Sequence, residues 1–253
     1  MPVASPAFII LAIGALFFAG FVKGTTGFGI TLIVLPVLAM AITPQEAIVL
    51  LSLPVFLMNF ATAASTLREY PELRRIRWML PVAFVCVPFG VKVLLWVDPA
   101  PMRAAIGVMI IVFVGMRFSG WSSAHMSGRG ETLFSVGMGA LVGFLFGAIM
   151  MPVAFIIFYL NAIGTRREPF VFLMNVIASV LSLIQVSSFT WHGLYAGEAW
   201  RNSLLMLAPA LAGLYVGTRF RRRLSERIFE RLVLGLLAIA GVILIVRYGR
   251  ELL

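Results

Sequence analysis

One short stretch near the N-terminus combines residue types that could bind an anion. It reads Gly-Phe-Val-Lys-Gly-Thr-Thr-Gly-Phe-Gly over residues 20–29. Glycines spaced this closely break a helix and expose backbone N–H groups at the start of the next one. The helix dipole and nearby hydroxyls attract negative charge there. The residues expected to contribute to this binding are Lys23, Gly24, Thr25, Thr26, Gly27 and Gly29.

Lys23 strengthens this prediction because it is the only lysine or arginine between residues 1 and 67. An ammonium group near the centre of a bilayer costs at least about 2.5–3.5 kcal/mol on insertion scales, so it needs a partner or a purpose. The alternative interpretation is structural. In that case the glycines allow close helix packing, and the Lys23 side chain reaches the membrane interface.

The composition indicates what kind of protein must position these residues. Of 253 residues, 61% are hydrophobic and 12% are charged, whereas soluble domains carry roughly 25% charged residues. So little charge cannot cover a water-facing surface, and an integral membrane protein is expected. Cys86 is the one cysteine, so an intrachain disulfide is excluded. The net charge of +10 is attributed to cationic loops that orient helices, and no nucleic-acid partner is expected.

Charged and Pro/Gly-rich breaks divide the chain into ten apolar segments, five in each half. None alternates polar and apolar residues, so the expected fold is all-α and polytopic. Several segments reach the ~20 residues that a helix needs to cross a bilayer. Two are short, and each follows a break, so they are either crossings or parts of re-entrant hairpins. The segments are 6–22, 28–43 (short), 45–66, 78–97, 101–118, 132–148, 150–163 (short), 169–190, 202–218 and 228–247.

The cationic residues fix the expected orientation. With Lys23 left aside, alternate loops divide the cations fourteen against five. The positive-inside rule places the richer set in the cytoplasm and both termini outside, in the cell (inner) membrane. The richer set is Arg68, Arg74, Arg75, Arg77, Arg117, Arg129, Arg166, Arg167, Arg219, Arg221, Arg222, Arg223, Arg227 and Arg231. The other set is Lys92, Arg103, Arg201, Arg247 and Arg250.

The two halves of the chain also resemble each other. Gly-Phe-Val-Lys-Gly at 20–24 matches Gly-Phe-Leu-Phe-Gly at 143–147, 123 residues later, and Gly90-Val-Lys matches Gly217-Thr-Arg after 127 residues. An odd number of segments per half gives the halves opposite orientations. The expected organisation is therefore a first repeat at 1–122 and a second at 123–253 within one transmembrane domain. Inverted repeats with short, interrupted segments are typical of secondary transporters.

The chain resembles the TauE/SafE sulfite exporter family of bacterial membrane proteins. The resemblance rests on GFVKGTTGFGITLIVLP followed by TPQEAIVLLSLP, on the second opening GALVGFLFGAIMMPVAFIIFYL, and on the total length. It covers essentially the whole chain. It implies export of sulfite, organosulfonates such as sulfoacetate, or related small anions, with the two repeat openings lining the pathway.

The second opening departs from the family pattern, because Ala148-Ile-Met-Met-Pro152 stands where a glycine cluster is usual. Fewer backbone donors are expected there. Met150 and Pro152 are assigned to the site, since a flexible thioether wall would suit an organosulfonate. Asn59 and Asn175 are also assigned to it, because Leu-Met-Asn recurs at 57–59 and 173–175. Interhelical hydrogen bonding is the structural alternative for both amides. Gln185 lies close to the predicted end of its segment and is given no role.

The other polar residues argue against an enzyme and against a metal or other cofactor. His125 and His192 both fall in loops without metal-ligand spacing. All acids lie at segment edges, and the expected role of Glu46 and Glu168 is to begin their helices. Without a buried carboxylate, uniport or a proton carried by the substrate is expected.

The function predicted from these observations is export of small sulfur-containing anions by alternating access. The partners are the anion and the lipid bilayer, and the oligomeric state is left open. An anion channel of the same fold and a non-transporting scaffold or partner subunit are the alternatives.

Overall fold

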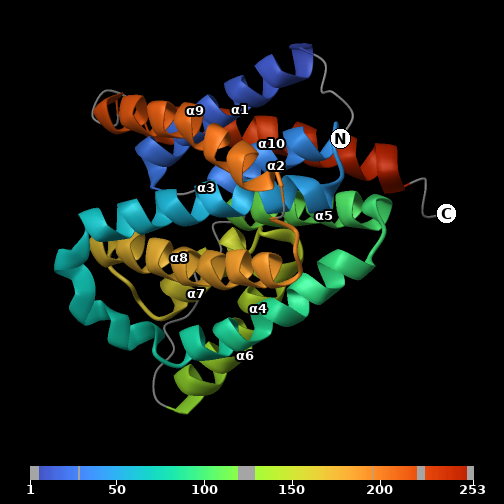
Figure 1. Ribbon diagram of the computed structural model, residues 1–253. Coiled ribbons are helices and arrows are strands. Elements are labelled where there is room, and N and C mark those ends of the chain that lie inside the picture. The colour runs from blue at the N-terminus through green and yellow to red at the C-terminus, as the bar shows by residue number, and fades with distance from the viewer. Residues whose placement is uncertain (1–5, 28, 119–128, 196, 221–225, 250–253) are drawn as a thin grey trace. The chain divides into compact units, whose positions relative to one another are not determined.

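The computed structural model describes residues 6–27, 29–118, 129–195, 197–220 and 226–249. These ranges hold ten α-helices, one 3₁₀ helix and no strand, which confirms the all-α prediction (Figure 1). Every predicted segment corresponds to one helix, with its ends shifted by a few residues. The helices are α1 (Pro6–Thr26), α2 (Ile30–Ala39), α3 (Pro44–Ser65), η1 (Leu67–Ile76), α4 (Met79–Trp96), α5 (Pro99–Phe118), α6 (Arg129–Ile149), α7 (Val153–Ala162), α8 (Arg167–Trp191), α9 (Ala199–Phe220) and α10 (Glu226–Gly249).

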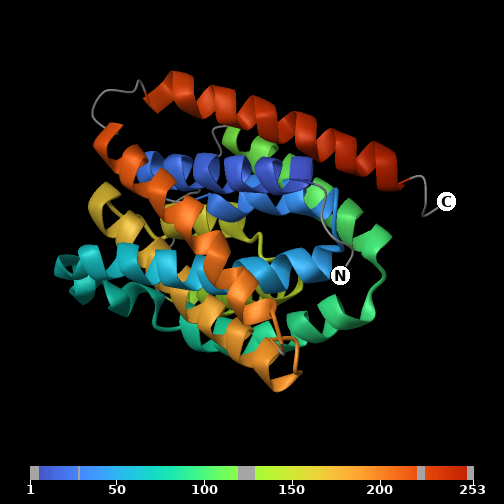
Figure 2. The same ribbon diagram turned by 45° about the horizontal axis from the view of Figure 1, so that its top comes forward.

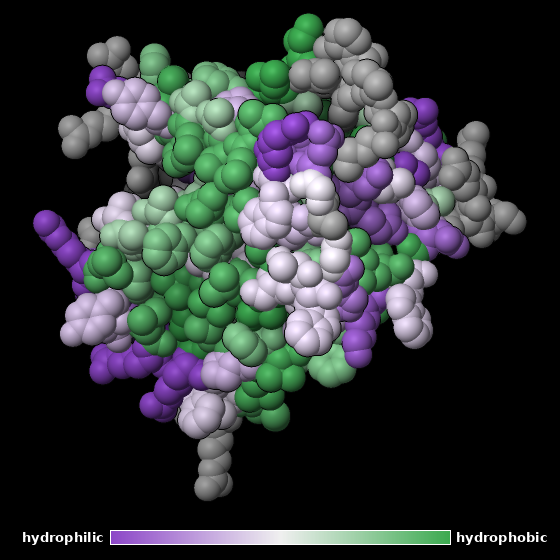
Figure 3. All heavy atoms as spheres, viewed as in Figure 1, coloured by the Kyte–Doolittle hydropathy of each residue, from purple (hydrophilic) through white to green (hydrophobic). Residues whose placement is uncertain are grey.

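The helices suit a bilayer. Six of those in the described ranges are long and apolar enough to cross one, namely α3, α4, α5, α6, α8 and α9. Large apolar side chains such as Phe84, Leu205 and Ile239 are more than half exposed, and apolar residues cover broad areas of the face in Figure 3. Lipid solvates such a surface and water does not. The protein is a multi-pass membrane protein.

Two helices are too short to cross by themselves. With ten residues each, α2 and α7 are about 15 Å long at 1.5 Å per residue, against a hydrocarbon core of about 30 Å. Each is preceded by a short break, as the sequence predicts. The helix bounds also recur: α2 and α7, the ends of α1 and α6, and the starts of α3 and α8 each lie 123 residues apart. The opposite orientation of the two halves remains a prediction.

The chain forms two compact units. Unit 1 contains Met1–Pro54, Asp98–Val114 and Tyr195–Leu253. Its closest helix pair is α1 with α9. A Cβ atom added at Gly20 would lie 2.1 Å from the carbonyl oxygen of Ala210, and one at Gly213 would lie 1.9 Å from that of Phe17. The absence of side chains at these positions lets the two backbones touch. The short α2 packs against α1 and α10, and it runs alongside α1 in Figure 2.

Unit 2 contains Val55–Val97 and Gly115–Leu194. Its closest pair is α4 with α6, and the contact is made in the same way. A Cβ at Gly90 would lie 2.1 Å from the carbonyl oxygen of Phe144, and one at Gly143 would lie 2.2 Å from that of Ala83. α8 packs against α4, α6, α7 and η1. Each compact unit thus takes helices from both sequence halves. The division at 122/123 describes repeats in the sequence and stays a prediction.

The start of α3 matches its sequence. The backbone N–H and hydroxyl of Thr43 both donate to Glu46 Oε2, at 3.1 and 2.9 Å, and the Glu46 N–H donates back to the Thr43 hydroxyl at 3.3 Å. This reciprocal pair is a capping box, which satisfies N–H groups at a helix start. The expected structural role of Glu46 is confirmed, whereas the side chain of Glu168 lies outside the described part of the chain.

Candidate functional site

The first opening is the junction of α1 and α2 in unit 1. α1 remains helical through Thr26, so the break lies at 27–29 and not at Gly24. Gly27 and Gly29 have φ angles of 90° and 100°, a left-handed conformation that glycine adopts without strain. Gly29 caps α2. The first N–H groups of α2 have no acceptor within that helix, as an anion site at this position requires.

The glycines and threonines of this opening divide between two roles. Gly24 lies inside α1 against α9, where a Cβ would be 2.5 Å from the Leu214 carbonyl oxygen, so the packing alternative accounts for it. The Gly27 N–H donates to the Lys23 carbonyl at 2.7 Å. Thr25 and Thr26 both donate their hydroxyl protons to the Val22 carbonyl at 2.8 Å. These hydroxyls must therefore rotate before either can donate to an anion.

Lys23 lies in the last turn of α1 and is 2% exposed. The alternative in which its side chain extends to the membrane interface therefore does not describe this structure. A long cationic side chain is almost never buried to this extent unless it interacts with another group. Its burial next to the helix break keeps Lys23 as the principal charged residue of the candidate site.

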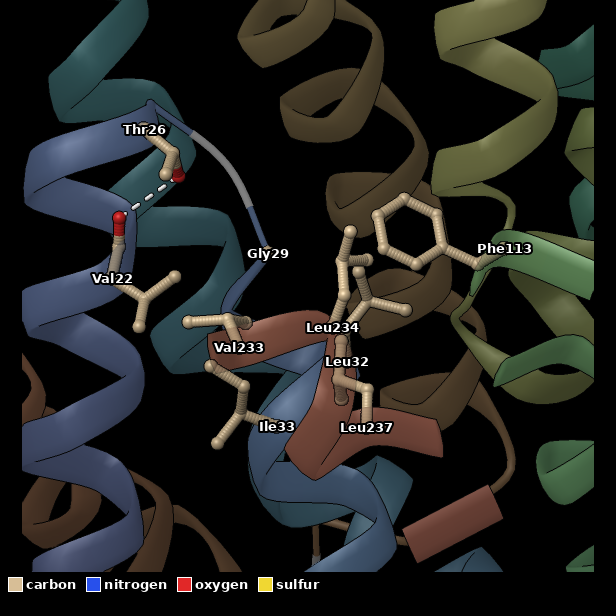
Figure 4. Close-up of a pocket in the computed structure, with 9 residues that line it drawn as sticks. All are labelled: Val22, Thr26, Gly29, Leu32, Ile33, Phe113, Val233, Leu234 and Leu237. Carbon is tan, nitrogen blue, oxygen red and sulfur yellow. Dashed lines mark hydrogen bonds between the residues drawn. The ribbon is translucent and has the colours of Figure 1, made fainter. Parts of the chain in front are cut away.

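A small cavity of about 40 Å³ adjoins this break within unit 1 (Figure 4). By volume it could hold about three water molecules. Its wall is almost wholly apolar and includes Thr26 from α1 and Gly29 from the break, so it lies beside the start of α2. The remaining lining residues are Val22, Leu32, Ile33, Phe113, Val233, Leu234 and Leu237. A small apolar group fits such a space better than a bare charge does.

The second opening is the junction of α6 and α7 in unit 2. α6 ends at Ile149, and Pro152 caps α7. Between them Met150 adopts φ 56° and is 1% exposed. A side chain in this left-handed conformation costs roughly 1–2 kcal/mol. Met150 lies 123 residues after Gly27, whose φ is also positive, so the second break keeps a positive φ at this position although the glycine is absent.

Both predicted amides lie in unit 2. Asn59 is 6% exposed on α3 and Asn175 is 1% exposed on α8. Asn175 Nδ2 donates to the Val171 carbonyl of its own helix at 2.8 Å. The ten predicted residues thus divide between the units. Unit 1 holds Lys23, Gly24, Thr25, Thr26, Gly27 and Gly29, and unit 2 holds Asn59, Met150, Pro152 and Asn175. That all ten form one site remains a prediction.

Arginines hold the far ends of both short helices, a feature that the sequence analysis missed. In unit 1, Arg103 donates to the carbonyls of Ala39 at 2.7 Å and Ile42 at 3.2 Å, at the end of α2. In unit 2, Arg75 donates to the Ile163 carbonyl at the end of α7, at 3.1 Å. A cation favours the negative end of a helix dipole. The sequence shows both arginines only as charges that orient the helices in the membrane, because a backbone carbonyl partner cannot be recognised from sequence.

The Arg75 contact is part of a larger connection in unit 2. Arg75 also pairs with Glu72. Tyr159, buried on α7, donates its hydroxyl proton to the Arg75 carbonyl at 3.1 Å, and Ser135 of α6 lies 3.0 Å from the same hydroxyl. The helix η1, which the polar sequence at 67–76 did not predict, is thereby fastened to α6 and α7.

Replacing Arg103 by methionine is expected to lower the stability of the protein by about 1.5–3 kcal/mol, the contribution of a hydrogen bond to a charged group. Arg201→Met is the matched control. The Arg201 guanidinium pairs with Glu198 at 2.6 Å but is 66% exposed, and exposed pairs contribute about 0–1 kcal/mol. Thermal unfolding in detergent measures both variants. Equal unfolding temperatures would show that Arg103 does not hold α2.

His192 lies away from the two helix breaks in the sequence and caps the end of α8. His192 follows α8, and its Nδ1 lies 2.7 Å from the Ser188 carbonyl oxygen. His125 lies outside the described residues.

The sequence matches the family described as Sulfite exporter TauE/SafE over residues 12–244. The chain belongs to the TauE/SafE sulfite exporter family. No curated protein and no solved structure matches it. Membership implies that this TauE/SafE chain is a membrane exporter of sulfite or related sulfur anions, consistent with its apolar helices. The expected resemblance is confirmed, and it covers nearly all of both units.

Proposed function

We propose that this TauE/SafE chain is a secondary transporter that exports sulfite and small organosulfonates, such as sulfoacetate, across the inner membrane by alternating access. The observation that carries the proposal is the pair of broken hairpins, α1–α2 and α6–α7, whose second helices have equal length and lie 123 residues apart. Discontinuous helices whose N-termini face an anionic group are the usual construction of transporter sites.

The site residues have separate roles in this proposal. Lys23 supplies positive charge, and the first turn of α2, beginning at Gly29, supplies N–H donors. Thr25 and Thr26 donate once their hydroxyls turn from Val22. Met150 and Pro152 shape the second opening, while Asn59 and Asn175 contribute amides from neighbouring helices. The arginine-rich loops lie in the cytoplasm and both termini lie outside.

The transported anion carries its own proton, or moves as a uniport. The positions of three acids support this part of the proposal. Glu46 is exposed at the start of α3, and Glu72 and Glu198 lie outside the long apolar helices. None of these three is placed as a carboxylate that relays protons through the membrane.

Thermal stability of the purified protein against sulfite, sulfate, thiosulfate, sulfoacetate, taurine and acetate tests the proposal. A ligand at a hundredfold excess over its Kd stabilises the native state by about 2.7 kcal/mol. We expect sulfite and the sulfonates to raise the unfolding temperature and acetate to leave it unchanged. If no sulfur anion stabilises the protein, the proposed substrate class is wrong. Flux that saturates and is stimulated by substrate on the opposite side separates a transporter from a channel.

A further inference from the structure

The strongest unassigned feature is Gln185, which the sequence analysis left aside as too close to a segment end. α8 ends at Trp191, one residue beyond the predicted segment and six residues after Gln185. Gln185 is therefore well inside α8. It is completely buried, although glutamine is mostly an exposed residue.

The Gln185 amide faces the second helix break. Its Nε2 donates to the carbonyls of Phe146 at 2.9 Å and Gly147 at 3.3 Å, in the last turn of α6. Two carbonyl acceptors fix the orientation of the amide, since the reverse orientation would set oxygen against oxygen. Pro152, the N-cap of α7, follows five residues after Gly147, and α8 packs against both α6 and α7. The amide therefore lies against the last turn of α6, just before the break that leads into α7.

The other atom of this amide is unsatisfied. Gln185 Oε1 is buried and has no hydrogen-bond partner among the residues that the structure describes. Leaving an acceptor in this state costs stability, and a lysine or arginine could serve the two α6 carbonyls without adding an acceptor. An amide that donates to the end of α6 and keeps an unsatisfied oxygen can receive a hydrogen bond from a ligand.

We propose that Gln185 Oε1 accepts a hydrogen bond from the substrate, so that the second opening selects small sulfonates carrying an O–H or N–H group. The sulfonate oxygens lie toward the N–H groups at the start of α7, where a helix N-terminus favours negative charge. The donor group of the same molecule reaches Oε1. This inference rests on the proposed function and adds to it the chemical feature by which the second opening distinguishes its substrates.

Isethionate and propane-1-sulfonate test it. They have the same charge and number of heavy atoms, but only isethionate carries a hydroxyl. Titration of thermal stability in the full-length protein gives an apparent Kd for each. We expect the wild type to prefer isethionate by about threefold to tenfold, the range of one net hydrogen bond. Gln185→Met, which is similar in shape, should bring the ratio of the two Kd values to about one. Ser187→Ala, at an exposed position of α8, should leave it unchanged.

The ratio separates recognition from a structural role, because a distorted helix break would weaken both anions alike and preserve the preference. Gln185→Lys can donate to both α6 carbonyls but carries no acceptor, so it should also bring the ratio to about one, which provides a second test if the methionine variant does not fold. A wild type without preference, or a methionine variant that keeps it, overturns the inference alone. A wild type that binds sulfite but neither of these sulfonates overturns the inference alone, whereas failure to bind any sulfur anion overturns the proposed function as well.

Discussion

Replacing Gly143 by alanine is expected to lower the stability of the protein by about 1–3 kcal/mol, the cost of overpacking a tight contact. The new Cβ would lie 2.2 Å from the carbonyl oxygen of Ala83 and 2.7 Å from its Cα. These are backbone atoms, so no side chain can rotate away, and α6 must separate from α4 instead. The unfolding temperature of the purified protein measures the effect.

Gly137→Ala is the matched control on the same helix, because a Cβ at Gly137 meets nothing within 4 Å. Alanine also favours a helix by about 1 kcal/mol over glycine, so this variant should be as stable as the wild type or more so. Unit 1 offers an independent pair on α1, with Gly20→Ala expected to destabilise and Gly14→Ala expected to be neutral. If Gly143→Ala and Gly137→Ala unfold at the same temperature, close backbone contact does not hold these helices together.

Lys23→Met is expected to abolish stabilisation by sulfur anions and to weaken their binding by at least tenfold, about 1.4 kcal/mol. Lys23 is buried in the last turn of α1, just before the break that precedes α2, so its charge acts with little screening. Titration of the unfolding temperature with sulfite and sulfoacetate measures the loss. The unfolding temperature of the variant without anion is the reference against which this loss is measured.

Lys92→Met makes the same change of charge and of side chain on α4, where Lys92 is exposed. It should leave anion binding unaltered. A purely structural role for Lys23 predicts the reverse pattern, in which Lys23→Met lowers the unfolding temperature in buffer while the protein still responds to anions. The two lysine variants therefore distinguish a role of Lys23 in anion binding from a purely structural role.

The helices could be predicted because each is a continuous apolar run, and the lipid makes that pattern almost obligatory. The helix η1 at 67–76 could not be predicted, because it is polar and is held in place by contacts with α7. Tyr159 donates to the Arg75 carbonyl, and the Arg75 side chain donates to the Ile163 carbonyl. The ends of α1 were also difficult to place. Gly24 has the same identity whether it breaks a helix or packs against one, and only its distance from Leu214 decides between the two roles.

The candidate site could be predicted only where it contains residue types that are rare in apolar sequence. Lys23 and the first break could be recognised because a cation and clustered glycines are rare in apolar sequence. Met150 gives no sign of its left-handed backbone, and Gln185 and Arg103 act on backbone carbonyls that any sequence provides. Such contacts depend on how the helices pack, which periodicity along the chain does not encode.

The pairing of α1 with α9 has a consequence for how the protein is made. Gly20 and Gly24 are translated well before their partners at residues 210–218. At 5–20 residues per second this delay is on the order of 10–40 s. The glycine face of α1 is thus available to other nascent helices throughout that interval. Neither half of the chain is expected to mature alone, whereas the two halves expressed together from separate messages can supply each other's missing helix.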